Sequence, residues 1–508
     1  MLKYPIGIQD FESLREGGYL YVDKTMFIEK LINTGKSFFL SRPRRFGKSL
    51  FINTLKYFFQ GRKDLFAGLY IENKVPEFSR PVIHLDFSSE AWKEIGLRNH
   101  MLDMLLEHAE NQNVSLTKLS LSERFSELIT SLSQKPVILI DEYDKPILHF
   151  IEVDNAKANE NREIMREFYS ILKPLEGDIH FLFVTGITRF SKASLFSDMN
   201  HLKDLTINSH FAGICGYTQT ELNDYFKNPI AEIATSKGLE TEEFKLQIKK
   251  WYNGYKWNID ADKVYNPFSI LNFLDDGTGE FINYWFASGL PTFLINTINK
   301  NQDYDFEEVK ASEILLNNFT IEKLNSLTLM FQGGYLTLKD KVDEDYTLVY
   351  PNLEVKRSLL AVILSDKMNE DDAGVMLRQL RNYFENRQEK EIRKTFEAIF
   401  AKIPNQIFNR KYEFYYHSIL VVAMQLLGCY VDAEVSVSDG RVDAVVKTKK
   451  YIYIIEFKVD QTAGIALDQV KEKGYATAYQ TDGRTILLLG INFLKKKVES
   501  FVIEEFLG

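Results

Sequence analysis

Residues that crosslink chains or bind zinc are scarce in this sequence. Among its 508 residues there are 2 cysteines and 8 histidines. Cys215 and Cys429 belong to different predicted domains, so we expect no disulfide framework. The histidines show no spacing typical of a zinc site. These shortages argue against a disulfide-stabilised secreted scaffold and favour a reducing compartment, for which we expect the cytoplasm.

Long apolar runs and low-complexity tracts are also missing. Residues 1–5 lack the hydrophobic core of a signal peptide, and the most apolar predicted helix, residues 418–431, is too short to cross a bilayer. We therefore expect no membrane partner. With 12 prolines and 45% hydrophobic residues, the chain is predicted to be globular throughout, and its length predicts about three domains.

An excess of positive charge is absent as well, because the formal net charge is −9. Nucleic-acid affinity comes largely from cations that displace counterions. A nucleic-acid partner would therefore have to bind a local patch, for which Lys447, Lys449, Lys450 and residues 495–497 are candidates. Short lysine runs of this kind are also typical of solvated turns.

A phosphate-binding motif follows an apolar segment near the N-terminus. Residues 37–40 predict a buried strand, and an apolar helix is predicted to run through Phe59. Gly47, Lys48 and Ser49 lie at the junction, where backbone N–H groups and a helix N-terminus can bind phosphates. Lys48 is then expected to reach the β and γ phosphates of a nucleotide, and Ser49 to hold Mg²⁺.

This loop departs from the general P-loop pattern at its first position. Arg42 stands where that pattern has glycine. An isolated Gly-Lys-Ser run also occurs for purely structural reasons, and the motif needs a partner elsewhere in the chain. The predicted nucleotide-binding loop comprises Arg42, Pro43, Arg44, Arg45, Phe46, Gly47, Lys48, Ser49 and Leu50.

The partner motif is an apolar strand at residues 136–142. It ends in Asp141 and Glu142, which supply the Mg²⁺-associated carboxylate and the water-polarising base that an ATPase requires. We therefore predict that Asp141 supports the metal and that Glu142 acts as the base. Together the two motifs favour a nucleotide site over a structural Gly-Lys-Ser turn.

Two more apolar segments, residues 81–87 and 180–189, predict further strands of the same sheet. An extra strand between the P-loop and the acidic strand resembles the ASCE division of P-loop ATPases. By that resemblance Thr185 is a candidate γ-phosphate sensor, and Arg189 is a candidate sensor or arginine finger. Both are equally explained as strand-end residues with local hydrogen bonds.

A second constellation of charged residues lies near the C-terminus. Glu456 and Lys458 are two residues apart on a predicted strand and therefore share a face, which Asp443 on the neighbouring strand can join. Two carboxylates can hold Mg²⁺, and the lysine can activate or orient a water molecule for attack on a phosphodiester. The alternative is a surface ion pair on a half-buried strand.

The elements around these residues are predicted in the order αβββαβ, with a helix at 412–430, strands at 433–437, 441–446 and 451–458, a helix at 463–479 and a strand at 485–490. This order resembles the core of PD-(D/E)XK nucleases. The resemblance implies that Asp443 and Glu456 are metal ligands and that Lys458 activates water. It further implies that Gln469 and Tyr475 line the cleft, with Glu413 as an additional ligand.

Further motifs extend the resemblance over nearly the whole chain. They are Tyr21-Val22-Asp23-Lys24-Thr25, the loop from Arg42 to Ser49, Leu139-Ile140-Asp141-Glu142-Tyr143-Asp144, Trp251-Tyr252-Asn253-Gly254-Tyr255 and Tyr265-Asn266-Pro267-Phe268-Ser269. In this order they resemble the bacterial AAA-ATPase-like proteins, in which an ATPase precedes a PD-(D/E)XK domain. Arg42 is the usual residue of that family at its position.

The expected fold is therefore α/β and multidomain. We predict an ASCE-type P-loop domain with a parallel sheet at residues 1–210, a helical lid at 211–300, a helical or winged-helix-like connector at 301–400, and a restriction-endonuclease-like domain at 401–508. The resemblance implies ATP and Mg²⁺ as cofactors, with Mn²⁺ as an alternative in the nuclease site.

The predicted function is ATP binding and hydrolysis coupled to metal-dependent cleavage of nucleic acid, DNA rather than RNA. A homo-oligomer is compatible with the sequence. The alternative is a nucleotide-controlled switch whose C-terminal domain only binds a nucleic-acid or protein partner. A third reading is an interaction scaffold in which neither site works.

Overall fold

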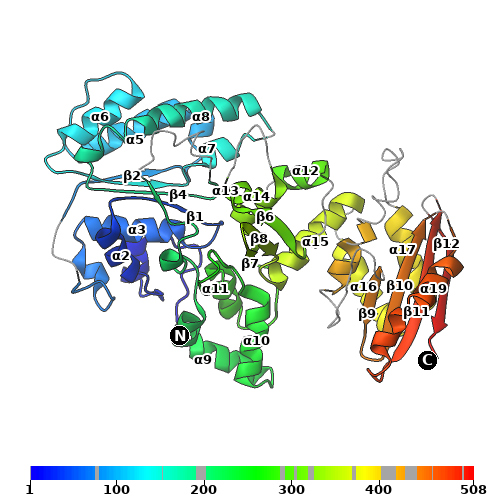
Figure 1. Ribbon diagram of the computed structural model, residues 1–508. Coiled ribbons are helices and arrows are strands. Elements are labelled where there is room, and N and C mark those ends of the chain that lie inside the picture. The colour runs from blue at the N-terminus through cyan, green and yellow to red at the C-terminus, as the bar shows by residue number, and fades with distance from the viewer. Residues whose placement is uncertain are drawn as a thin grey trace. The chain divides into compact units, whose positions relative to one another are not determined.

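The structure is a computed structural model of the full chain. It describes residues 2–74, 79–151, 153–189, 202–285, 292–301, 306–317, 325–368, 373–401, 419–420, 422–428, 443–459, 461–494 and 497–507. The chain divides into two compact units, Met1–Asn301 with Phe306–Glu354, and Gln302–Asp305 with Val355–Gly508 (Figure 1). The four-domain boundaries expected from the sequence stay a prediction.

The first unit is built on a five-stranded sheet in which every neighbouring pair is parallel. The strand order is β2-β3-β4-β1-β5. Strands β1, β3 and β4 are buried along their whole length, as continuous apolar runs between two helical layers must be. The strands are β1 Ser37–Ser41, β2 Val82–Asp86, β3 Val137–Asp141, β4 Phe181–Gly186 and β5 Lys203–Asp204.

This strand order confirms the expected fold class and decides which residues meet. Strand β4 lies between β1 and β3, whereas β2, which separates the two motifs in the sequence, lies at the sheet edge. Ser41 pairs with Gly186, and Asp86 pairs with Asp141. The carboxyl ends of the strands therefore share one edge, which is where ligands bind in open parallel sheets.

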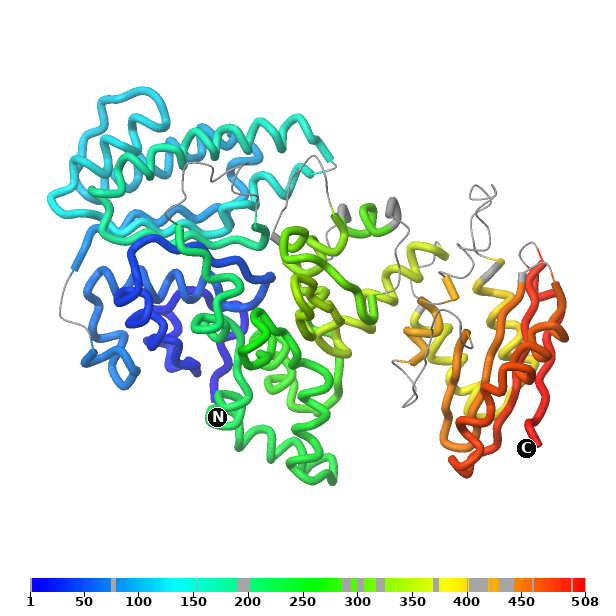
Figure 2. The backbone as a smooth tube through the Cα atoms, viewed as in Figure 1, coloured from blue at the N-terminus to red at the C-terminus, as the bar shows by residue number. Residues whose placement is uncertain are grey.

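Helices cover both faces of this sheet (Figures 1 and 2). One layer contains α2 and α3, and the other contains α5, α6 and α8, which pack on one another. The helices of this part are α1 Phe11–Glu16, α2 Met26–Thr34, α3 Lys48–Phe59, α4 Trp92–Ile95, α5 Leu97–Asn111, α6 Leu121–Ser131, α7 Lys145–Leu148 and α8 Asn155–Ser170.

A helical segment follows the sheet and has its own core. It contains α9 Gln219–Ser236, α10 Thr241–Tyr252 and α11 Pro267–Asp276, and its core includes Phe226, Phe244 and Phe273. A capping box between Thr218 and Glu221 starts α9, and the Asn266 side chain caps α11. The aromatic residues Tyr252, Tyr255 and Trp257 of this segment are buried.

The last part of the first unit combines helices with three strands, in the region predicted to be a helical or winged-helix-like connector. The elements are α12 Thr292–Asn301, β6 Val309–Ser312, α13 Glu313–Asn317, α14 Ser326–Gly333, β7 Thr337–Val342 and β8 Asp345–Val349. The strands form an antiparallel sheet in the order β6-β8-β7. Strand β6 has only 4 residues, and β7 contains the charged run Lys339-Asp340-Lys341, so neither shows a clear apolar strand pattern in the sequence.

The second unit is a four-stranded mixed sheet with helices on both faces. The strand order is β12-β11-β10-β9, and only the β10–β11 pair is parallel. Helix α19 packs on β10 and β11, whereas the rings of Phe384 and Phe396 meet Tyr453 and Phe457 of β10 on the other face. Helix α15 Leu353–Met368 begins with two residues of the first unit, Leu353 and Glu354, and continues into the second. The other elements of the second unit are α16 Ala373–Glu385, α17 Glu389–Ala401, β9 Ala444–Lys447, β10 Tyr451–Val459, α19 Ala463–Glu472, η6 Tyr475–Tyr479, β11 Thr485–Leu494 and β12 Lys497–Glu505.

This unit agrees with the expected fold class and adds an element. The structure extends the last predicted strand to Leu494 and adds β12, which the sequence analysis did not predict. The predicted strand at 433–437 lies outside the described residues, as does most of the helix at 412–430. No helix in the described ranges is long and apolar enough to cross a membrane.

Candidate nucleotide and metal sites

The loop between β1 and α3 has the backbone geometry of an anion-binding loop. Arg45 has φ 66° and Gly47 has φ 93°, whereas Phe46 between them is not among the residues with positive φ. Left-handed and ordinary backbone conformations therefore alternate along the loop. Such alternation turns successive N–H groups toward one concavity. Helix α3 begins at Lys48 and adds the positive end of its dipole at the same point.

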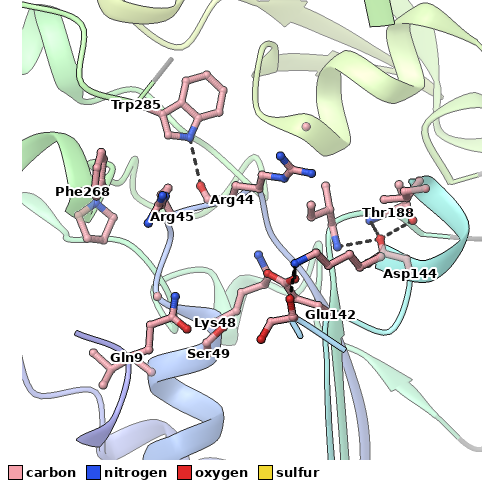
Figure 3. A pocket seen from close by; sticks show the side chains of 18 of the residues that line it. Gln9, Arg44, Arg45, Lys48, Ser49, Glu142, Asp144, Thr188, Phe268 and Trp285 are labelled. Carbon is pink, nitrogen blue, oxygen red and sulfur yellow. Dashed lines mark hydrogen bonds and ion pairs between the residues drawn. The ribbon is translucent and has the colours of Figure 1, made fainter. Parts of the chain in front are cut away.

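A cavity of about 670 Å³ lies over this loop, which is a typical size for a small-ligand pocket. The cavity lies within the first unit, and its walls include the N-terminal segment 5–9, the residues after β3, and residues of α11 and α14. Figure 3 shows Lys48, Ser49 and Glu142 together at its floor. The predicted loop residues that line it are Arg44, Arg45, Gly47, Lys48, Ser49 and Leu50.

Lys48 is almost entirely buried in this cavity wall. Lys48 is 6% exposed, and its Nζ donates a hydrogen bond to the carbonyl oxygen of Pro43 at 2.9 Å. A buried ammonium group is stable only if hydrogen bonds or anions replace its hydration. The geometry therefore leaves Lys48 suited to exchange a loop carbonyl for a phosphate oxygen.

Asp141 and Thr185 meet at the carboxyl edge of the sheet, on adjacent strands. Thr185 Oγ1 donates to Asp141 Oδ1 at 2.5 Å. Burial raises the pKa of Asp141, while the Ser49 and Thr185 hydroxyl groups and the charge of Lys48 oppose that rise. Ser49 and Asp141 thus offer a hydroxyl and a carboxylate, which are oxygen donors of the kind that Mg²⁺ prefers.

Glu142 follows Asp141 and lines the cavity. Its φ of 50° lies in the left-handed region, which is costly for a residue with a side chain and is often found at functional sites. Its Oε2 lies 3.3 Å from Nζ of Lys145, and that Nζ also donates to the carbonyl of Ser88 at 2.6 Å. The predicted base is therefore held by an ion pair at the cavity surface.

In the second unit, Asp443 and Glu456 lie on the same face of the sheet. Ile455 pairs with Ala444 across the antiparallel β9–β10 ladder, so residues 443 and 456 are opposite one another. Asp443 Oδ2 accepts a hydrogen bond from the backbone N–H of Phe457 at 2.7 Å. Burial and the nearby charge of Asp443 raise the pKa of Glu456, and Lys458 acts in the opposite direction.

Lys458 joins this pair to helix α19. Its Nζ lies 3.0 Å from Glu456 Oε1 and donates to Gln469 Oε1 at 2.6 Å. Glu456 is 2% exposed, and its Oε2 is buried without a hydrogen-bond partner among the described residues. A carboxylate oxygen in that state is suited to a cation, so the donor set fits one divalent ion that keeps several water ligands.

The remaining predicted residues of this site are less fully defined. The hydroxyl of Tyr475 is buried with no hydrogen-bond partner in the described part of the chain, and Tyr475 follows α19 in η6. Glu413 lies outside the described residues. Within the described ranges, no group of three or more histidine, cysteine, aspartate or glutamate residues could hold a metal ion.

Comparisons with known proteins agree with the order of the two expected domains. Residues 5–196 match the family model described as "Predicted AAA-ATPase", and residues 411–502 match that of the PD-(D/E)XK nuclease superfamily. An uncharacterized protein in the vnfD 5′ region of Azotobacter chroococcum mcd 1 is 37% identical over 526 positions, which cover 99% of each chain. The chain belongs to the AAA-ATPase-like family with a PD-(D/E)XK domain. No solved structure gave a significant match.

Three loop residues of this AAA-ATPase-like protein do not line the cavity and instead anchor the loop. Arg42 is 1% exposed, and its Nη1 donates to the carbonyls of Ser41 and Thr206 at 2.9 and 2.8 Å. Its guanidinium lies 4.7 Å from the ring centroid of Trp257, and the Phe46 ring meets Tyr255 edge-on. Pro43 lies against Gly334. Contact of these three residues with nucleotide stays a prediction.

Arg189 of the AAA-ATPase-like protein is likewise engaged within the first unit. Its Nη2 lies 2.5 Å from Asp204 Oδ2, and its backbone N–H donates to Gln332 Oε1 at 2.9 Å. Neither Arg189 nor Thr185 lines the cavity. Their roles as sensors or as a finger stay predictions, and Arg189 would have to leave Asp204 to reach a phosphate.

Asp144 is a residue of this family's acidic run to which the sequence analysis gave no role. It lines the cavity, and its Oδ2 accepts hydrogen bonds from Ile187 N, Thr188 N and Thr188 Oγ1 at 2.9, 2.6 and 2.6 Å (Figure 3). Burial raises the pKa of Asp144. The carboxylate thus fixes the backbone after β4. A second aspartate three residues after Asp141 was the available signal.

Proposed function

We propose that this protein binds and hydrolyses ATP with Mg²⁺ in the first unit. The observation that carries the proposal is the convergence of Lys48, Ser49 and Asp141 at the carboxyl edge of a parallel sheet, beside a cavity of about 670 Å³. Lys48 would neutralise the β and γ phosphates, and Ser49 and Asp141 would hold the ion. The ion would supply charge neutralisation between the phosphates.

Within that site Glu142 would orient the attacking water. Its carboxylate lies on the cavity surface, one residue beyond the proposed ion-binding Asp141. The ion pair with Lys145 directs this carboxylate and partly neutralises its charge. Basal turnover is therefore expected to be slow.

We further propose that the second unit cleaves nucleic acid, DNA in preference to RNA, in a metal-dependent reaction. Asp443 and Glu456 would hold Mg²⁺ or Mn²⁺, and the ion would supply charge for a phosphate oxygen. Lys458, fixed between Glu456 and Gln469, would hold the attacking water. A local cation such as Lys447, which lies 5.1 Å from the ring centroid of Tyr479, would help to offset the net negative charge of the chain.

The test measures nucleotide turnover and nucleic-acid cleavage on the same full-length preparations. Lys48→Ala should abolish ATP turnover, whereas Lys118→Ala, at an exposed lysine outside the cavity, should not. Glu456→Ala should abolish cleavage and leave ATP turnover intact, with the exposed Glu472→Ala as its control. Cleavage that survives Glu456→Ala would remove the proposed nuclease site.

A second candidate is a nucleotide-controlled switch whose C-terminal domain binds a partner without cutting it. The observation in its favour is that both proposed catalytic glutamates, Glu142 and Glu456, are ion-paired with lysines. This candidate predicts tight ATP binding, slow turnover, and no cleavage in either Mg²⁺ or Mn²⁺. A homo-oligomer and a cytoplasmic location also stay proposals, and mass measurement with and without ATP would test the first.

A further inference from the structure

Trp285 connects the far wall of the cavity to the phosphate-binding loop. It lines the cavity, and its indole Nε1 donates to the backbone carbonyl of Arg44 at 3.1 Å (Figure 3). The indole is held by ring contacts to Tyr335, at 5.2 Å between centroids, and to Tyr255, at 6.4 Å. The hydrogen bond joins residues that are 241 positions apart in the chain.

This hydrogen bond fixes the orientation of one loop peptide. The carbonyl and the N–H of a trans peptide point in opposite directions. Holding the Arg44 carbonyl therefore also sets the direction of the Arg45 N–H. Arg45 has φ 66°, which is unfavourable for a residue with a side chain, so this peptide needs external support. A P-loop binds phosphates through such N–H groups, and the orientation of each peptide decides whether its N–H points toward the phosphate.

Glu354 holds Trp285 from behind. Its Oε1 accepts hydrogen bonds from the backbone N–H groups of Trp285 and Tyr284 at 2.9 and 2.8 Å, and its Oε2 accepts one from Ser269 Oγ at 2.8 Å. Glu354 is 0% exposed and does not line the cavity. A fully buried carboxylate that accepts three hydrogen bonds fixes its donors at the cost of its own hydration.

Ser269 brings a second wall of the cavity to the same carboxylate. It belongs to α11, and its neighbours Phe268 and Leu271 line the cavity. The guanidinium of Arg45 lies 4.7 Å from the Phe268 ring centroid. Glu354 therefore anchors two walls of the cavity. One wall contacts the phosphate-binding loop through Trp285 at Arg44, and the other contacts it through Phe268 at Arg45.

We infer that Trp285 and Glu354 are positioning residues for phosphate binding. Trp285 orients the Arg44–Arg45 peptide, and Glu354 acts through Trp285 and α11 without touching the ligand. This inference rests on the proposed nucleotide site, and it assigns a role to a buried glutamate in the first turn of α15. A glutamate that served only the core would affect the melting temperature and leave nucleotide affinity unchanged.

The first experiment measures the dissociation constant for MgATP by calorimetry on full-length variants. Trp285→Phe keeps the ring packing and removes the N–H donor, so the dissociation constant should rise about tenfold, as expected for one lost hydrogen bond. Trp251→Phe is the matched control, because Trp251 stacks on Phe281 and does not line the cavity. Wild-type affinity in Trp285→Phe would overturn the inference.

The second experiment asks whether Glu354 acts through Trp285. Glu354→Ala should raise the dissociation constant by at least the same factor, because it also releases α11, whereas Glu354→Gln keeps an acceptor for the two N–H donors and should retain affinity. The double variant Trp285→Phe/Glu354→Ala should bind about as well as Glu354→Ala alone, because effects within one path do not add. Additive losses, near a hundredfold, would mean that the two residues act separately and would overturn the path.

A stability control separates positioning from general loosening of the fold. Ile248→Ala removes a buried side chain of the helical core, away from the cavity, and should lower the melting temperature without changing the dissociation constant. If Glu354→Ala does not fold, Trp285→Phe and Glu354→Gln still decide the result. If the wild type itself fails to bind MgATP, it is the proposed function that fails.

Discussion

Nζ of Lys145 lies 3.3 Å from Oε2 of Glu142, and both residues line the cavity over the β1–α3 loop. An ion pair at a partly exposed position contributes little to stability, but it changes the charge that a base presents to water. The base of the proposed ATPase is thus restrained by a residue of α7 that lies three positions away in the chain.

Loss of that ion pair should raise basal ATP turnover. Lys145→Ala frees the Glu142 carboxylate, and we expect kcat to rise about two- to fivefold, as the energy of an exposed pair allows, with little change in KM. Steady-state ATPase kinetics would measure it. Lys157→Ala breaks a similar pair with Glu160 outside the cavity and should have no effect. A fall in kcat for Lys145→Ala would show instead that the lysine assists catalysis.

Glu354 should make the stability of the first unit depend on pH near neutrality. Burial raises the pKa of Glu354 from 4.5 to about 7. Between these values the folded chain keeps a proton that the unfolded chain has lost, so stability falls as pH rises through this window and levels off above it. The difference corresponds to about 3 kcal/mol at most.

Melting temperatures measured from pH 4.5 to pH 8 would test this dependence. Glu354→Gln removes the titrating group, so its melting temperature should change less between pH 4.5 and pH 8 than that of the wild type. Burial raises the pKa values of Tyr252, Tyr255 and Tyr284, and the charge of the same carboxylate adds to the rise, so these tyrosines stay neutral there and do not contribute. Parallel profiles for the wild type and Glu354→Gln would contradict the assignment to Glu354.

Gln469 should matter for cleavage and not for metal binding. It accepts the 2.6 Å hydrogen bond from Lys458, whereas Asp443 and Glu456 supply the proposed metal ligands. Gln469→Ala should slow cleavage about tenfold or more, because Lys458 would lose the hydrogen bond that fixes its orientation. Calorimetry with Mn²⁺ should give an unchanged affinity. The exposed Gln480→Ala is the control, and equal cleavage rates for both variants would count against a role for Gln469.

Gly490 should be intolerant of any side chain. A Cβ there would clash with the carbonyl oxygen of Ala463 and lie 3.0 Å from Cγ of Leu467, both in α19. Gly490→Ala should destabilise the second unit by about 1–3 kcal/mol and displace α19, which carries Gln469. Gly464→Ala is the matched control, because its nearest new contact is 3.7 Å away. Thermal unfolding of both variants would show whether the close approach matters.

Much of the fold was predictable because its signals are local. Continuous apolar runs predicted β1, β3 and β4, and the structure places all three in the buried sheet. The weak signals failed where strands are short or polar, as in β6 and β7, or where a strand begins with a charged residue, as β12 does at Lys497. In those cases pairing with neighbouring strands decides the conformation.

The sequence by itself determined where the two candidate centres lie in the chain. A Gly-Lys-Ser run between an apolar strand and a helix places N–H groups where an anion can bind, and two residues two positions apart on a strand share a face. Those facts depend on backbone geometry alone, and they place Lys48 and the Glu456–Lys458 pair without reference to any other segment.

Only the tertiary structure decided what surrounds those centres. It buried Arg42 against Trp257, brought Trp285 to a carbonyl 241 residues away, and placed Glu354 behind both walls of the cavity. Contacts between segments so far apart leave no periodic signal in the chain, because they arise when whole helices and strands pack on one another. For the same reason the sequence assigned no role to Asp144, because only the fold brings it within hydrogen-bond distance of Thr188 N after β4.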